Sequence, residues 1–161
     1  MNNFKNHFTE LNFFLKYNIS FVVFYSPMLI TKNKNLFKKI YYKSKISLPV
    51  NTNNPEFKYI RENYLKIKKI KFDYILAIGG GKTIDTAKLI KYLFFINKIS
   101  KKLIVIPTLF GSGTETTDSA VYYINSIKFS KQSSIIQPNK IIYNFILAQQ
   151  APINFIINAA L

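Results

Sequence analysis

The sequence predicts an α/β fold with a mostly parallel sheet flanked by helices. Short apolar runs, such as residues 19–25 and 72–78, alternate with longer segments whose apolar residues recur at a helical period. The runs are apolar at nearly every position, which is typical of strands buried on both faces of a parallel sheet. The chain has 161 residues and 48% hydrophobic content, so one domain with a sizeable core fits its length.

The first half is expected to contain, in order, a helix at 4–17, a strand at 19–25, a helix at 28–42, a strand at 46–50 and a helix at 57–67. Pro49 makes the strand at 46–50 doubtful or an edge strand, because proline cannot donate to a sheet ladder. Residues 51–54 form a turn, and Pro55 suits the first turn of the helix that follows.

The second half is expected to contain a strand at 72–78, a helix at 82–95, and strands at 103–106, at 120–124 and within 135–143 after Pro138. Residues 151–161 carry an apolar helical pattern that starts at Pro152 and has no stop signal. We therefore expect a first domain over 1–152, with 153–161 as the start of a truncated helical domain.

The formal charge of +16 does not by itself indicate nucleic-acid binding. Arg61 is the only arginine among 23 basic residues, although arginine is best suited to bidentate contacts with bases and phosphates. The lysines are scattered among Ile and Asn, a composition that AT-rich codons produce. We expect a solvated lysine surface and no nucleic-acid partner.

The residue types also exclude several kinds of site. With no cysteine, the chain has no disulfide, thiolate metal site or cysteine nucleophile, and its only histidine, His7, cannot build a multi-histidine metal site. Every apolar run is shorter than the roughly 20 residues that a membrane helix needs. No export signal is evident, so we expect a cytoplasmic protein without a membrane partner.

The first motif joins a buried strand to a helix through Gly79-Gly80-Gly81. Glycines let the backbone approach a ligand closely, and the free N–H groups of a first helical turn favour a diphosphate. Lys82 can add charge and Thr83 a hydroxyl donor. Asp85 is either a favourable partner of the helix dipole or a residue that holds the loop. A plain glycine turn is the alternative interpretation.

The second motif is the loop at 107–117, Pro-Thr-Leu-Phe-Gly-Ser-Gly-Thr-Glu-Thr-Thr, which also follows a strand. It is rich in hydroxyls and backbone donors. Ligands of open α/β sheets bind outside the carboxyl ends of the strands, so two such loops predict one crevice. A hydrophilic surface loop is the alternative interpretation.

Together these motifs resemble the iron-containing (group III) alcohol dehydrogenases, relatives of glycerol dehydrogenase and dehydroquinate synthase. That family carries Gly-Gly-Gly-Ser-x-x-Asp-x-Ala-Lys, matched by Gly79 to Lys88 with Lys82 in place of Ser. It also carries Pro-Thr-Thr-x-Gly-Thr-Gly-Ser-Glu, matched by Pro107 to Glu115. The resemblance runs from about residue 19 onward and implies the family's Rossmann-like, dehydroquinate synthase-like domain.

The resemblance also implies that this domain binds NAD or NADP. The glycines, Lys82 and Thr83 would cradle the pyrophosphate, and the second loop would lie beside the adenine, ribose and nicotinamide. Lys131 is the weaker match, since Lys128 could take its place. The implied cofactor-binding residues are Asn54, Gly79, Gly80, Gly81, Lys82, Thr83, Thr108, Leu109, Ser112, Thr114 and Lys131.

In the family, a following helical domain supplies the ligands of a divalent metal, iron or zinc, and the complete enzyme transfers hydride between the cofactor and a small alcohol or aldehyde. Without that domain we expect this chain to contain no catalytic or metal-binding residue and to be inactive alone. A homo-oligomer and a complementing C-terminal chain both stay open as partners. Alternatives are a glycerol or polyol-phosphate dehydrogenase relative, suggested by Lys82, and a non-catalytic nucleotide-binding remnant or partner subunit.

The resemblance bears on cofactor choice as well. NAD-specific relatives often place an Asp at the end of the first strand, where it holds the ribose 2′-hydroxyl. Here that place falls near Ser26, with Lys32 and Lys34 nearby in the sequence. A neutral serine does not repel a 2′-phosphate, so the sequence leans away from strict NAD specificity.

Overall fold

The computed structural model describes Tyr17, Leu147 and residues 19–32, 34–109, 111 and 113–144. The helix expected at 4–17, apart from its last residue, and the apolar segment at 151–161 lie outside the described residues.

The centre of the molecule is a five-stranded sheet in which every neighbouring pair is parallel. Its order is β2-β1-β3-β4-β7. The strands are β1 (Phe21–Tyr25), β2 (Ile46–Pro49), β3 (Tyr74–Gly79), β4 (Lys102–Pro107) and β7 (Lys140–Ile141). The predicted α/β fold is confirmed, and β2 lies at an edge, the place where its proline is tolerated.

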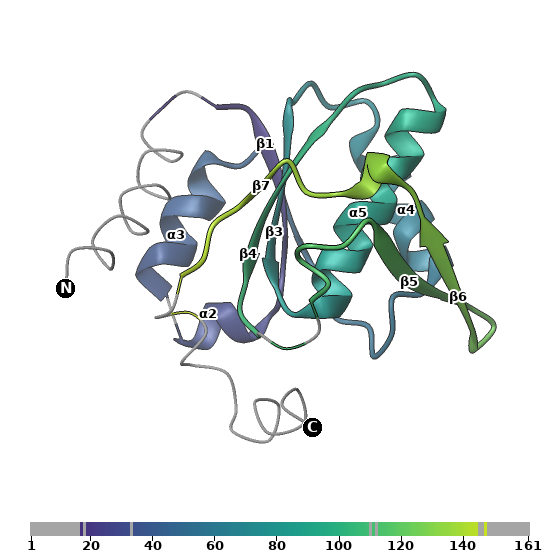
Figure 1. Ribbon diagram of the computed structural model, residues 1–161. Helices are drawn as coiled ribbons and strands as arrows, with labels where there is room; N and C mark the ends of the chain where they lie inside the picture. The colour runs from purple at the N-terminus through teal and green to yellow at the C-terminus, as the bar shows by residue number, and fades with distance from the viewer. Residues whose placement is uncertain are drawn as a thin grey trace.

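Helices cover both faces of this sheet (Figure 1). Helices α2 (Met28–Lys32) and α3 (Lys34–Lys43) lie on one side, and α4 (Phe57–Ile67) and α5 (Gly81–Ile96) lie on the other. The sequence predicted a single helix over 28–42, whereas the structure has two helices in that region. The helices expected at 57–67 and 82–95 are confirmed.

The strand β1 shows why the apolar runs are continuous. All five of its residues are buried. Val22 and Phe24 pack with α4 and α5, while Phe21, Val23 and Tyr25 pack with Leu29 and Ile40 of α2 and α3. Because successive side chains point to opposite faces of a sheet, a strand covered on both sides needs an apolar residue at every position.

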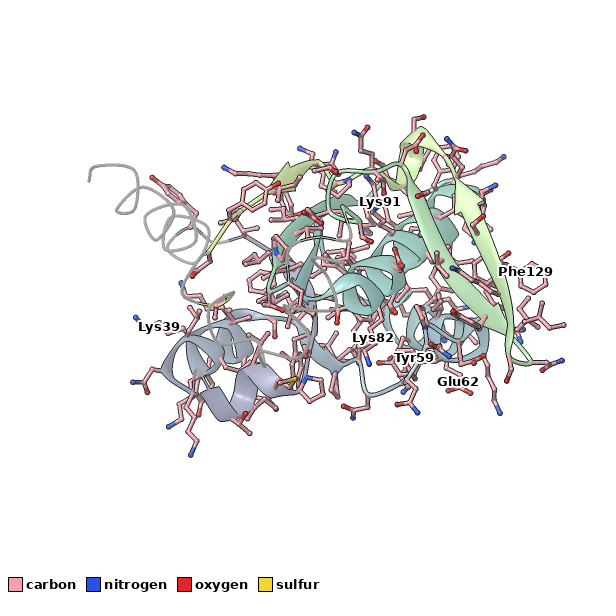
Figure 2. All side chains as sticks on the ribbon, turned by 60° about the horizontal axis from the view of Figure 1, so that its bottom comes forward. Lys39, Tyr59, Glu62, Lys82, Lys91 and Phe129 are labelled. Carbon is pink, nitrogen blue, oxygen red and sulfur yellow. The ribbon has the colours of Figure 1, made fainter. Side chains whose placement is uncertain are left out.

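Beyond α5 lies a two-stranded antiparallel hairpin of β5 (Ser119–Ile124) and β6 (Ile127–Gln132). Asn125 and Ser126 at its turn have φ angles of 49° and 65°, as type I′ hairpin turns require. The strand β6 was not predicted, because its side chains are mostly exposed and make no apolar run. Figure 2 shows Phe129 at the outer side of this hairpin.

After the hairpin come a short 3₁₀ helix, η1 (Ser134–Ile136), and β7. The strand predicted within 135–143 is therefore present, but it is only two residues long. Among the described residues, no helix has both the length and the apolar character needed to cross a membrane.

Candidate functional site

The carboxyl ends of the central strands lie side by side. The backbone N–H of Ser26, just after β1, donates to the Ile78 carbonyl of β3 at 2.9 Å. The N–H of Thr108, just after β4, donates to the Gly79 carbonyl at 3.0 Å. The prediction that the glycine loop and the second loop leave the same edge of the sheet is thus confirmed. The strand order reverses between β1 and β3, and that switch point is where open α/β sheets bind ligands.

Gly80 brings these two loops into contact. A Cβ atom built on Gly80 would lie 2.8 Å from Cδ1 of Leu109, which belongs to the second loop. Gly80 therefore provides space for Leu109, and not an unusual backbone conformation, since its φ of −84° is ordinary. Because its three residues carry no side chains, the glycine loop is bare backbone, buried at Gly79 and half-buried at Gly80 and Gly81.

The helix α5 begins directly after this bare loop. Its N-cap is Gly80, and no side chain of the described residues caps the helix. Its first turn contains no acidic residue. The first N–H groups of a helix lack intrahelical acceptors and carry a partial positive charge, so this end of α5 favours an anion.

The loop after β2 reaches the same place. Lys82 donates from Nζ to the Thr52 carbonyl at 3.1 Å, which joins this loop to the start of α5. The buried hydroxyl oxygen of Thr52 has no hydrogen-bond partner in the part of the chain that the structure describes. Asn54 is exposed two residues later, ahead of the buried Pro55. Lys82 therefore lies between two of the segments that carry predicted site residues.

The other predicted positions differ in exposure. Thr108, Leu109 and Thr114 are half-buried at the second loop, while Ser112 lies outside the described residues. Thr83 is only 2% exposed, and its side chain packs under Gly79. The sequence predicted that the Thr83 hydroxyl would donate to a ligand, whereas its burial favours a role in packing.

Lys131 is not brought together with the loops. Its Nζ lies 4.5 Å from the centre of the Tyr92 ring on α5. Tyr92 is eleven residues beyond Gly81, or about 16 Å along the helix. Lys128, the alternative position, is close enough to Asp85 in the second turn of α5 to act on its pKa. Of the two lysines, Lys128 lies nearer to the start of α5.

A buried polar stripe runs along α5 beneath the second loop. Asp85 is 7% exposed and accepts a hydrogen bond from the backbone N–H of Val121. Burial raises the pKa of Asp85 to about 7, although that hydrogen bond, Lys88 and Lys128 act in the opposite direction. Asp85 thus bonds to strand β5, whereas the sequence predicted that it would either favour the helix dipole or hold the glycine loop.

Sequence reasoning gave no role to two further polar residues of this stripe, Lys88 and Lys91. They are 0% and 8% exposed, and burial lowers the pKa of both. The available signal was a lysine at each of two positions inside an otherwise apolar stretch of α5. Scattered lysines are common in this chain, so that signal was hidden by composition.

A separate open hollow lies between α4 and the turn of the β5–β6 hairpin. It is lined by residues such as Glu56, Arg61, Glu62, Tyr123 and Asn125 and contains none of the predicted site residues. Its lining is partly exposed and carries both acidic and basic side chains, so we place the candidate site at the strand ends instead.

The described residues do not fit a metal centre. Within residues 19–32, 34–109 and 113–144, no three His, Cys, Asp or Glu side chains gather closely enough to hold an ion. The bare glycine loop and uncapped helix, by contrast, fit a phosphate-containing ligand.

The parallel sheet, its switch point and the glycine loop that opens α5 define a Rossmann-like α/β domain. The family model of iron-containing alcohol dehydrogenases matches residues 6–145. The chain therefore belongs to the iron-containing alcohol dehydrogenase family.

Individual relatives agree with this assignment. An alcohol dehydrogenase of Thermococcus barophilus is 29% identical over 104 residues, covering 52% of this chain and 28% of that protein. A glycerol-1-phosphate dehydrogenase (NAD(P)+) of Pyrobaculum islandicum is 39% identical over 49 residues, covering 30% of this chain and 13% of that protein.

Among solved structures, the iron-containing alcohol dehydrogenase of Thermococcus thioreducens superposes with a TM-score of 0.82 at 19% identity. The match covers 94% of this chain and 46% of that one, and at this identity it bears on the fold alone. The chain thus spans less than half the length of these relatives.

Proposed function

We propose that this chain binds a dinucleotide, NAD or NADP, across the carboxyl ends of β1, β3 and β4. The proposed contacts are Asn54, Gly79, Gly80, Gly81, Lys82, Thr83, Thr108, Leu109, Ser112 and Thr114. Lys131, which the family resemblance implied, is left out because its side chain lies over Tyr92 in the middle of α5. The proposed cofactor domain is 1–152, with 153–161 starting a helical domain.

One observation carries this proposal: a bare glycine loop opens an uncapped helix at the switch point of a parallel sheet. A diphosphate placed there would accept hydrogen bonds from the first N–H groups of α5 and gain from the helix dipole. Lys82, already held beside the loop by Thr52, would add a positive charge. Leu109 would limit the space on the side of the second loop.

The bound nicotinamide would accept or donate a hydride, which is the chemistry that the cofactor itself supplies. The chain's residues would bind the diphosphate and orient the ring. We propose that the whole protein is an oxidoreductase acting on an alcohol or aldehyde. Any metal ligands would come from outside the described residues, because those residues do not fit a metal centre.

A second candidate is a glycerol or polyol-phosphate dehydrogenase, which would bind the same cofactor. Lys82 after the three glycines favours it, because that lysine resembles those branches of the superfamily. The Pro107 to Glu115 loop favours the alcohol dehydrogenase branch instead. A purely nucleotide-binding partner subunit would differ from both in showing no turnover in any assembly.

Cofactor binding can be tested by titrating the chain with NADH and with NADPH while following nicotinamide fluorescence. We expect Lys82→Gln to weaken binding of both by about three- to tenfold, because it removes one charge near the diphosphate. Lys66→Gln is the matched control, since Lys66 is exposed in the last turn of α4. Absence of saturable binding to the unaltered chain would overturn the proposal.

Cofactor choice provides a second test. We expect NADPH to bind at least as tightly as NADH, because Ser26, half-buried at the end of β1, brings no charge against a 2′-phosphate. Ser26→Asp should shift the preference toward NADH by about tenfold through repulsion of that phosphate. The measurement is the ratio of the two dissociation constants. NADH binding much tighter than NADPH before the substitution would contradict the argument.

A further inference from the structure

Lys88 is a fully buried lysine in the middle of α5. Its Nζ lies within hydrogen-bond distance of the carbonyl oxygens of Thr114, Thr117 and Ser119, at 2.5, 2.7 and 2.8 Å. It also lies 3.2 Å from the hydroxyl oxygen of Thr117. An ammonium group has three N–H donors, so these carbonyls can satisfy it completely.

Packing alone does not explain this residue. Burying an ammonium group is unfavourable unless it is fully hydrogen-bonded, and an apolar side chain would fill the same space without that cost. An apolar side chain would, however, leave three inward-facing carbonyls without their donor. The carboxylates of Asp85, Asp118 and Glu115 act to keep Lys88 charged against the effect of burial.

The segment that Lys88 holds is the end of the second loop. It follows Gly113, whose φ of 63° turns the chain, and it begins with Thr114, one of the proposed cofactor contacts. Thr116 hydrogen-bonds back to the Gly113 carbonyl from both its N–H and its hydroxyl. Three hydrogen bonds from the Lys88 ammonium group therefore connect this turn to α5. The first residues of α5 form the other wall of the crevice.

Lys91 offers a comparison on the same helix, one turn later. It is also buried, and its Nζ donates to the Gln137 carbonyl at 2.8 Å and to Oδ1 of Asn139 at 3.0 Å. Both partner atoms lie just before β7 and outside the second loop, although the Gln137 side chain donates to the Thr116 carbonyl of that loop at 3.5 Å. Figure 2 shows Lys91 well apart from Lys82, the residue at the start of α5. Lys91 thus matches Lys88 in chemistry and burial but holds a different segment.

We propose that Lys88 is a positioning residue that fixes the backbone of residues 114–119 and thereby sets the second wall of the dinucleotide crevice. This rests on the proposed function, because the effect on binding requires that a dinucleotide occupies the crevice. The effect on the loop itself does not require it.

The experiment compares Lys88→Met with Lys91→Met in the full chain. Three quantities are measured: the melting temperature, peptide-level hydrogen exchange, and the dissociation constants of NADH and NADPH. We expect both variants to lose stability. Only Lys88→Met should raise exchange in residues 113–119 and weaken dinucleotide binding, by about tenfold, since hydrogen bonds to a charged group are lost. Lys91→Met should leave binding within about twofold.

Equal exchange in residues 113–119 for the two Met variants would overturn the proposal, and so would an equal loss of binding. If Lys88→Met does not fold, Lys88→Gln and Lys91→Gln keep the comparison, because glutamine retains two donors without the charge. A chain that binds no dinucleotide but loosens residues 113–119 only in the Lys88 variant would contradict the proposed function while supporting the positioning of the loop.

Discussion

At the scale of single residues, the lack of a side chain matters for a different reason at each of the neighbouring glycines, Gly79 and Gly80. A Cβ on Gly79 would meet Oγ1 and Cβ of Thr83 at 2.5 and 2.8 Å, and those atoms belong to a short side chain on α5. A Cβ on Gly80 would come too close to Cδ1 of Leu109, which is the far end of a flexible side chain. Gly79 therefore sets how closely helix and strand pack, whereas Gly80 sets the space at the crevice.

We predict that Gly79→Ala costs about 1–3 kcal/mol of the free energy of unfolding, as overpacking does. Gly80→Ala should cost less than about 1 kcal/mol, because Leu109 can turn aside, but it should weaken dinucleotide binding. Urea denaturation and cofactor titration of both variants check this. Similar stability losses in the two variants, with unchanged binding in Gly80→Ala, would show that the glycines act alike.

The buried carboxyl of Asp85 links stability to pH. Its pKa of about 7 in the folded chain lies above the value of about 3.9 expected when unfolded. Between these values the folded state holds a proton that the unfolded state has released, so this group's stabilising contribution is lost as pH rises toward 7. The groups that act on Asp85 are Lys88 and Lys128, together with the N–H of Val121.

We predict that Asp85→Asn, which is neutral at every pH, gains stability relative to the unaltered chain by about 2 kcal/mol between pH 5 and pH 8. Urea denaturation at pH 5, 6.5 and 8 measures the difference. Asp118→Asn, the same exchange at a half-buried loop carboxylate, is the control. Parallel profiles for the unaltered chain and Asp85→Asn would argue against a protonated Asp85.

At the scale of elements, aromatic rings join α4 and α5 to the segment before β3. Phe94 of α5 meets Tyr64 of α4 at a centroid distance of 5.0 Å and Phe72 at 5.5 Å, with steep angles between the rings. Lys101 lies over the Phe72 ring with its Nζ 4.2 Å from the centre. This cluster lies near the end of α5 farthest from the crevice.

We predict that Phe94→Ala lowers the free energy of unfolding by about 3–5 kcal/mol, because Phe94 is only 1% exposed. The neighbouring Phe95 is 48% exposed, so Phe95→Ala should cost no more than about 0.5 kcal/mol. Chemical denaturation of the two variants measures both values. Comparable losses would mean that α5 is rotated from the orientation described.

The elements that the sequence predicted are those whose burial leaves a pattern. β1 and β3 are apolar throughout, β4 is apolar and buried after its first residue, Lys102, and α4 is amphipathic, so each could be located. The strand β6 could not, because its one partner among the described residues is β5 and its exposed side chains alternate weakly. The buried stripe of Asp85, Lys88 and Lys91 depends on what lies opposite α5, which no local pattern contains.

At the scale of the whole molecule, the described residues form one α/β fold in which helices cover both faces of a parallel sheet and both motif loops lie at one edge of it. The same family resemblance that located the glycine loop also located the second loop, because both motifs are contiguous in sequence. It was less useful for Lys131, which depends on the register of a hairpin that the sequence did not reveal. The motifs could thus be found in the sequence, whereas the residues that the fold brings next to them from distant segments could not.

We predict that the 161-residue chain alone does not oxidise ethanol or propanediol when loaded with ferrous iron or zinc. Its single histidine and lack of cysteine leave too few ligands for such a centre. The measurement is cofactor reduction by the purified chain with each metal and each cofactor. Metal-dependent turnover well above a control without enzyme would require ligands outside the described residues.

The central claim is that a dinucleotide lies across the carboxyl ends of β1, β3 and β4. Mapping of amide chemical shifts during titration with NADPH and NADH tests it most directly. We predict that the largest changes fall on residues 79–83, on Thr108 and Leu109, and on Thr114, while the amides of the residues that line the hollow between α4 and the hairpin turn stay unchanged. Changes confined to that hollow, or none at saturating cofactor, would contradict it.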